Sequence, residues 1–206
     1  MMAKSMAIER LRQGERSGMR IIRTPQGAHH SYSRFKLNEH GHVIAKFVGL
    51  PLFAADEMRR LGEAGIYVQP ETKMCLLSEH GNSYDAKHRL IARREYSIAL
   101  MPTGVIASDE GRTTEHLRHF GVVRYGYKKP LAGFAPRILE KVSLEHLREE
   151  MGYEYIAVPH DPIDCGGMHQ WVLTAQRKAL KRELGSAYGG PSDLWNSRGC
   201  FAFEVV

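Results

Sequence analysis

The chain has 206 residues, of which 43% are hydrophobic and 25% are charged, an ordinary globular composition that excludes a disordered or fibrous protein. No apolar run approaches the roughly 20 residues needed to cross a bilayer, and the N-terminus lacks the apolar core of a secretory signal. The sequence therefore predicts a cytoplasmic protein with no membrane partner.

The net charge of +6 is concentrated at the N-terminal end. Residues 1–36 contain eight basic and two acidic residues, so this segment carries the whole excess, and the other 170 residues balance at 21 of each sign. A cationic segment on a neutral body indicates a polyanionic partner, either nucleic acid or an acidic protein surface. The alternative is a basic helix that is merely solvated.

In chain order, the first expected element is a helix over residues 2–17, which ends at Gly18. Its apolar stripe is narrow, so we expect it to dock on the body, on a second copy of the chain or on a larger assembly. Residues 1–18 are thus predicted to form a basic helical arm. Residues 19–206 are predicted to form a single domain that begins with a strand over Met19–Arg23.

A hairpin is predicted next, with strands over Ser31–Leu37 and His42–Val48 and a turn at residues 38–41. Period-two alternation places Tyr32, Arg34 and Lys36 on one face of its first strand. An aromatic ring between two cations is suited to base stacking with phosphate contacts. Together with the arm and a basic corner after residue 127, this face gives the candidate binding residues: Arg12, Arg16, Arg20, Arg23, Tyr32, Arg34, Lys36, Lys128 and Lys129.

The middle of the chain mixes short helices and short strands. The expected helices run from Pro51 to Leu61, from Thr113 or Thr114 to Phe120, and from Ser143 to Met151, where Gly152 ends the helix. The expected strands are Ile66–Gln69, Lys73–Leu77, Glu95–Met101, Val122–Tyr127 and Tyr153–Val158. The residues around Gly133 and Pro136 are expected to form a loop.

Toward the C-terminus, Met168–Leu184 has the clearest helical spacing in the chain and is predicted to be a long helix that ends at Gly185. A final strand is expected over Cys200–Val206. Strands and helices do not alternate in regular β-α-β units, so the predicted fold class is α+β, with a mixed or largely antiparallel sheet flanked by helices.

Reactive side chains concentrate in the loop before that predicted helix. Cys165 precedes two glycines and the expected helix start, where unpaired N–H groups and the helix dipole lower a thiol pKa. It is a candidate nucleophile, with His169, His160 or His42 as its general base. The segment DCGGMHQWV resembles the cysteine-bearing helix start of papain-like hydrolases, and GHVIAKFVG resembles their histidine strand. Their order in this chain implies a circularly permuted member of that family.

The same loop offers other interpretations. His160, Asp164 and His169 are ligand types that suit zinc or manganese, and the histidine–aspartate doublet that begins at His160 resembles that of metal-dependent phosphohydrolases. The glycine pair at a helix start is suited to binding an anion. In the simplest interpretation, Asp164 caps the helix and Cys165 packs as a small apolar group.

Several kinds of chemistry are excluded or disfavoured. Cys75, Cys165 and Cys200 lie far apart and form no C-x-x-C pair, which argues against a disulfide scaffold and a cysteine-rich zinc site. No phosphate loop, dinucleotide-binding loop or zinc-protease motif occurs, and we expect no cofactor. The charge asymmetry is a direct property of the sequence, whereas the reactive site rests on proximity along the chain. We therefore favour a binding or assembly protein over a cysteine- or metal-dependent hydrolase.

Overall fold

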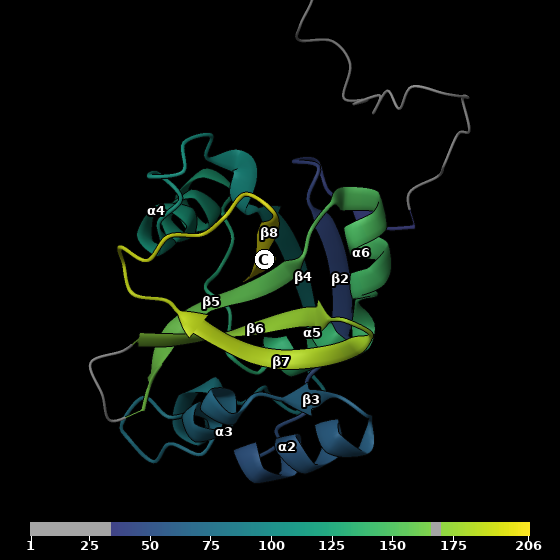
Figure 1. The fold of residues 1–206 in the computed structure, drawn as a ribbon, viewed down its shortest axis with the longest axis vertical. Helices are drawn as coiled ribbons and strands as arrows, with labels where there is room; N and C mark the ends of the chain where they lie inside the picture. The colour runs from purple at the N-terminus through teal and green to yellow at the C-terminus, as the bar shows by residue number, and fades with distance from the viewer. Residues whose placement is uncertain (1–33, 166–169) are drawn as a thin grey trace, which may run out of the picture. The chain divides into compact units, whose positions relative to one another are not determined.

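The computed structural model describes residues 34–165 and 170–206. Their centre is a mixed eight-stranded sheet with the strand order β1-β2-β4-β8-β5-β6-β7-β3, so the predicted α+β class is confirmed (Figure 1). The pairs β5–β8 and β3–β7 are parallel, and the other neighbours pair antiparallel. The strands are β1 (Lys36–Leu37), β2 (Val43–Val48), β3 (Tyr67–Val68), β4 (Glu95–Pro102), β5 (Tyr155–Asp164), β6 (Gln170–Lys178), β7 (Lys181–Tyr188) and β8 (Gly199–Glu204).

Helices cover both faces of this sheet. The α-helices are α2 (Ala54–Glu63), α3 (Pro70–Leu76), α4 (Thr114–His119), α5 (Phe134–Lys141) and α6 (Leu144–Met151), and single turns occur at η1 (Tyr84–His88), η2 (Thr103–Val105) and η3 (Phe120–Arg124). In Figure 1, α2 and α3 lie on one side of the sheet and α4 lies on the other. Within the described ranges, no helix has the length and apolar character needed to span a bilayer. The helix expected over residues 2–17 and the strand expected over 19–23 lie outside these ranges, and the proposed division at residue 18 stays a prediction.

The larger core lies on the face that α2, α3, α5 and α6 cover. Successive strand residues point to opposite faces, and Ile98 of β4 and Ile156 of β5 join this core together with Leu61 of α2 and Ile138 of α5. All four side chains are excluded from water. Burying a side chain of this size completely stabilises the fold by about 1.5–3 kcal/mol. This face therefore supplies most of the apolar contact that holds the helices on the sheet.

A smaller core lies on the opposite face, under α4 and η3. Phe201 and Phe203 of β8 pack there with Leu117 of α4. Gly121 of η3 rests directly on the Phe203 ring, since a Cβ built at this position would lie 2.3 Å from the ring carbon Cζ. Only glycine permits this approach, and it brings the segment after η3 down onto β8, where Lys128 forms a bridge with Glu204.

Several predicted elements are confirmed within one to three residues. The strand β2, the helix α2, the strand β4 and the last strand β8 lie where they were expected, whereas β1 covers only Lys36–Leu37 of the strand expected over Ser31–Leu37. Thr113 caps α4 by accepting from the His116 N–H, and Ser143 caps α6 by accepting from the His146 N–H. Gly152 ends α6 with a positive φ of 74°, as a glycine after a helix commonly does.

The long helix predicted over Met168–Leu184 is wrong, because this stretch contains the hairpin formed by β6 and β7. β6 is buried on both faces: Val172 faces the smaller core, while Leu173 and Ala175 face the larger one. Such a strand reads as a short continuous apolar run, which periodicity alone cannot distinguish from a buried helix. Hydrogen bonds from β5 and β7, which are not visible in the local sequence, decide between the two.

Three shorter predictions are also wrong, and each has a local cause. The strand expected over Lys73–Leu77 belongs to α3, where Pro70 is the first residue of the helix rather than a break before it. The loop expected around Pro136 is part of α5, which tolerates proline in its first turn. The strand expected over Val122–Tyr127 is largely replaced by η3, which Gly121 allows to pack on β8.

A buried ion-pair network joins α2 to α5. The Glu57 carboxylate of α2 contacts the guanidinium groups of Arg60 and Arg137, and the Glu140 carboxylate of α5 contacts the same two groups. Glu57 and Arg137 are only 2% and 3% exposed. Neither charge has water to replace a lost partner, so Glu57 depends on the two arginines and Arg137 depends on the two glutamates.

We predict that Glu57→Ala lowers the free energy of unfolding by about 3 kcal/mol, because the Arg137 guanidinium stays buried without this carboxylate. Glu63→Ala is the matched control, since Glu63 lies on the same helix but is exposed, and its loss should cost less than about 0.5 kcal/mol. Urea unfolding of both variants measures the difference. Equally small effects would contradict the role assigned to the buried pair.

Candidate nucleic-acid interface

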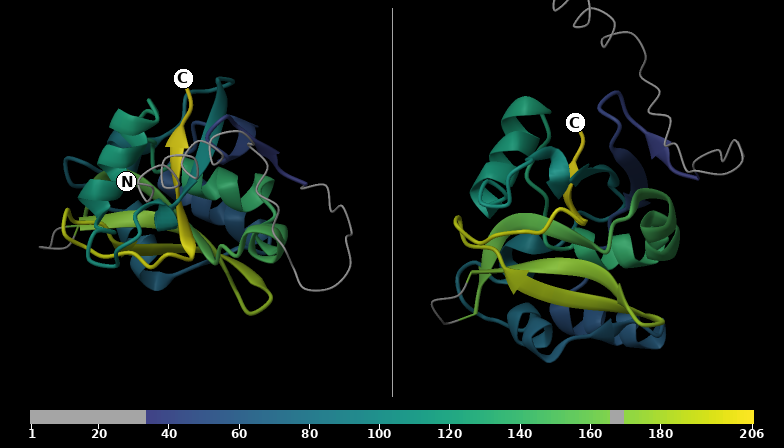
Figure 2. Two further views of the ribbon diagram at one scale, coloured as in Figure 1. Left: turned by 90° about the horizontal axis from the view of Figure 1, so that it is seen from above. Right: turned by 45° about the horizontal axis from the view of Figure 1, so that its top comes forward.

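The tip of the hairpin formed by β6 and β7 carries the densest group of positive charges among the described residues. The two strands pair in register from Trp171 opposite Tyr188 to Lys178 opposite Lys181. Ala179 and Leu180 form the connecting turn, and Ala179 adopts a positive φ of 54°, as primed two-residue turns require. The hairpin projects from the body in the left view of Figure 2.

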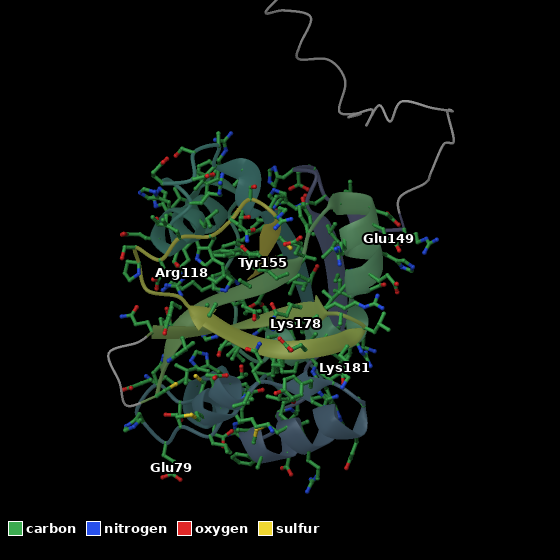
Figure 3. All side chains as sticks on the ribbon, viewed as in Figure 1. Glu79, Arg118, Glu149, Tyr155, Lys178 and Lys181 are labelled. Carbon is green, nitrogen blue, oxygen red and sulfur yellow. The ribbon has the colours of Figure 1, made fainter. Side chains whose placement is uncertain are left out.

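Four cations occupy the six residues of this tip, which we call the hairpin tip (residues 177–182). Lys178 and Lys181 are exposed and lie across from each other (Figure 3), and they have no ion-pair partner among the described residues. Leu180 between them is 85% exposed. An isolated exposed leucine is ordinary, but here it sits at the end of a protrusion whose flanks are all cationic.

The other two cations fix the tip to the body. Arg177 pairs with Glu145 of α6 at 2.8 Å. Arg182 donates to the carbonyl oxygens of Leu139, in the last turn of α5, and Ala64, which follows α2, at 3.2 and 3.1 Å. Carbonyl groups at helix ends lack intrahelical partners, and a cation there also interacts favourably with the helix dipole. The tip therefore has a fixed position on these helices.

An open cavity of about 450 Å³ lies beside the hairpin tip, against the turn that joins α5 to α6. Lys141 lines this cavity together with Arg177 and Arg182, and the two carboxylates of Glu140 and Glu145 lie among them. Both carboxylates already contact arginine guanidinium groups. Because Lys141 is exposed, it extends the cationic surface from the hairpin tip to the end of α5.

The predicted binding face of the first hairpin is only partly described. Arg34 contacts α6, where its backbone N–H donates to the Glu150 carboxylate at 3.1 Å and its guanidinium contacts His146. Lys36 is exposed on β1. The remaining predicted residues of this region, Arg12, Arg16, Arg20, Arg23 and Tyr32, lie outside the described residues. Arg34 therefore marks the point where the cationic N-terminal segment joins the body.

The predicted basic corner at Lys128 and Lys129 is weaker than its sequence suggests. Lys129 pairs with Asp161 at 2.9 Å. One of the two positive charges of this corner is therefore compensated locally. Lys128 exchanges two backbone hydrogen bonds with Glu204 of β8, and only its side chain is exposed. Tyr127, next to them, stacks on Phe203 and belongs to the smaller core. The binding role expected for Lys128 and Lys129 stays a prediction.

The candidate nucleophile Cys165 lies beside another cysteine. Its sulfur is 2.9 Å from Sγ of Cys75, and no histidine lies within hydrogen-bond distance of it among the described residues. With β6 in place of the expected helix, no helix dipole is there to stabilise a thiolate, and burial raises the pKa of the Cys165 thiol. His169 lies outside the described residues, so the papain-like interpretation stays a prediction.

The candidate bases His42 and His160 each have another role. The Tyr127 hydroxyl accepts from the Asn38 amide at 2.7 Å and donates to Nδ1 of His42 at 2.8 Å, because an amide nitrogen can only donate. His42 thus lies under η3, by the smaller core, whereas Cys165 packs on the larger core across the sheet. His42 and Cys165, which the papain-like resemblance would pair, therefore lie on opposite faces of the sheet.

His160 fills an irregularity in β5, where the pairing with β6 shifts between Val158 and Ile163. The Leu173 N–H donates to Nε2 at 3.0 Å, and Nδ1 donates to the Asp161 carbonyl at 2.8 Å, so both ring nitrogens are occupied. A metal ion would have to displace one of these bonds. Within residues 34–165 and 170–206, no group of three or more His, Cys, Asp and Glu side chains is arranged to hold a metal, and the predicted ligand His169 lies outside them.

Three buried histidines are neutral in the folded protein. Burial lowers the pKa of His160 to about 3 and that of His88 and His42 to about 4, from an ordinary value of 6.5. His88 lies next to His160, with ring centroids 4.9 Å apart, so protonating one disfavours protonating the other. In the unfolded chain all three take up protons near pH 6.5.

We therefore predict that stability is fully present above pH 6.5 and falls as the pH drops from 6.5 toward 4, because the unfolded state binds more protons in this window. Each histidine contributes roughly 1 kcal/mol per pH unit. The variant His160→Gln keeps an acceptor for the Leu173 N–H but does not titrate, so its thermal melting temperature should fall less steeply with pH than that of the wild type. Parallel declines in both proteins would contradict this assignment.

The sequence contained a signal for the hairpin tip that its helical interpretation obscured. Residues 177–182 read RKALKR, a run with four basic residues and no acidic one. Placed on a helix, these charges spread around the surface, whereas on a hairpin they converge at one end. Comparisons of the chain with protein-family models, with curated protein sequences and with solved structures gave no match.

Proposed function

We propose that the protein binds nucleic acid through two cationic parts of its chain, the N-terminal segment and the hairpin tip. The observation that carries this proposal is the pair of exposed lysines, Lys178 and Lys181, at the end of a projecting hairpin. Neither has an acidic partner among the described residues, so both are available to replace counterions on a phosphate backbone.

Arg34, at the start of the described residues, and Arg177 of the hairpin tip both contact α6. Arg34 pairs with Glu150, and Arg177 pairs with Glu145. These two glutamates are five positions apart on one helix, a rise of about 7.5 Å at 1.5 Å per residue. Arg34 and the hairpin tip can therefore contact the same polyanion.

The shape of the hairpin tip favours nucleic acid over an acidic protein surface. A phosphate backbone presents a regular row of charges that lysines on both edges of a narrow hairpin can follow. Leu180 at its end is apolar and exposed, and proteins that enter a DNA groove commonly place an apolar side chain between flanking cations. An acidic protein surface would satisfy the lysines but would leave Leu180 without a contact.

We predict that the double variant Lys178→Ala/Lys181→Ala binds a duplex oligonucleotide more weakly and with a flatter salt dependence. Losing two phosphate contacts should reduce the slope of log K against log salt by about 2. Fluorescence anisotropy over a series of salt concentrations measures this slope. The matched control is Lys73→Ala/Lys87→Ala, which removes two exposed lysines from α3 and η1 and should leave the slope unchanged.

Three results would contradict the proposal. One is an equal change of slope in both double variants, which would mean that net charge rather than the hairpin tip controls binding. Another is the absence of any binding by the intact protein at low salt. Equal binding to polyglutamate and to the duplex would assign the surface to an acidic protein partner instead.

A further inference from the structure

Two cysteines that are 90 residues apart in the chain meet where α3 lies beside the end of β5. Their sulfur atoms are 2.9 Å apart. Cys75 is buried on α3, and Cys165, directly after β5, is half-buried and so reachable from solvent. A disulfide bond is about 2.05 Å long, so the sulfur atoms need to approach by less than about 1 Å to form one.

Hydrogen bonds already hold together the two segments that carry these cysteines. The Ser78 hydroxyl, just beyond α3, donates to the Asp164 carbonyl, and the Asp164 N–H donates to the Asn82 carbonyl at 3.4 Å. The Asn82 amide in turn donates to the carbonyl oxygen of Pro162 in β5. These bonds hold the two segments side by side, so the sulfur atoms of Cys75 and Cys165 stay close together in the folded protein.

We propose that Cys75 and Cys165 form a modification site, an intrachain disulfide that is made by exchange with a low-molecular-weight disulfide such as oxidised glutathione. The bond ties α3 to the end of β5. The third cysteine, Cys200, is fully buried in β8 and contacts the Tyr155 carbonyl. It takes no part in the exchange.

The exchange proceeds in two balanced steps. The Cys165 thiolate attacks one sulfur of oxidised glutathione, which breaks that disulfide, forms a mixed disulfide and releases one glutathione thiolate. The Cys75 thiolate then attacks the Cys165 sulfur, which forms the intrachain bond and releases the second glutathione. The two protons of the protein thiols end on the two released glutathione molecules. The protein loses two electrons and the oxidant gains them.

The surroundings of the two thiols set the pace of this exchange. Burial raises the pKa of the Cys75 thiol and of the Cys165 thiol. The thiolate is the attacking species, so exchange is slow at neutral pH and accelerates as the pH rises. Cys165 reacts first because it is the more exposed of the two.

The test is to incubate the intact reduced protein with oxidised glutathione at mildly alkaline pH. We expect an intact mass lower by two hydrogen atoms, a peptide map in which the Cys75 and Cys165 peptides are joined, and a higher melting temperature than that of the reduced protein, because the bond closes a long loop. Dithiothreitol should restore the reduced mass and melting temperature.

Two alanine variants assign the order of attack. Cys75→Ala should accumulate one glutathione adduct on Cys165, and Cys165→Ala should acquire neither an adduct nor a disulfide. A wild-type protein that keeps a glutathione adduct on Cys165, that joins Cys200, or that forms only intermolecular disulfides would overturn the proposal. These outcomes are read on the wild-type chain, so they hold even where a variant fails to fold.

Discussion

The buried contact between the Glu57 carboxylate and the Arg137 guanidinium is the constraint on which the rest of the molecule depends. It fixes α2 against α5 on the larger core, and it thereby brings together the carbonyl groups at the ends of these two helices. Arg182 can reach both carbonyl groups only because the helices are held in this relation. The position of the hairpin tip thus depends in part on the ion pairs and apolar contacts that hold α2 against α5.

The β6–β7 hairpin is buried near the middle of the molecule and exposed at its tip. Near the middle of the molecule, Val172, Leu173 and Leu184 are buried, and the strands are part of the core. Toward the tip, the same two strands leave the core and carry exposed cations. Continuous backbone pairing between β6 and β7 extends from the buried to the exposed part, so the core makes the tip rigid. Lysines on a rigid backbone lose less conformational freedom on binding than lysines on a mobile segment would.

The parts of the fold that could be predicted from the sequence are those that local chemistry decides. Ser143 and Gly152 mark the two ends of α6, because a hydroxyl at the first turn and a glycine with positive φ act within a few residues. The β6–β7 hairpin could not be predicted in this way. The apolar run of β6 fits a helix as well as a buried strand, and its pairing with β5 on one side and with β7 on the other cannot be read from apolar spacing.

The candidate sites divide in the same way, into features that the local sequence predicts and features that only the packing of distant segments creates. The sequence predicted binding residues at Lys128 and Lys129, and in the structure Asp161 pairs with Lys129 while Lys128 stays exposed. The reactive loop was located by proximity along the chain. In three dimensions His160 accepts a hydrogen bond from the Leu173 N–H where the pairing of β5 with β6 is irregular. Cys165 contacts Cys75, which lies 90 residues away in the chain. No spacing rule connects residues that only the packing of α3 against β5 brings together.

The central claim is that nucleic acid lies against the hairpin tip. The most direct measurement places a photoreactive benzophenone side chain at position 180, or at position 194 as a control, and irradiates each protein with a labelled duplex oligonucleotide. Leu180 and Leu194 are both highly exposed leucines, at 85% and 63%, but Leu194 lies in the loop between β7 and β8. We predict cross-linking from position 180 and little or none from position 194. Equal cross-linking from both positions, or from position 194 alone, would contradict it.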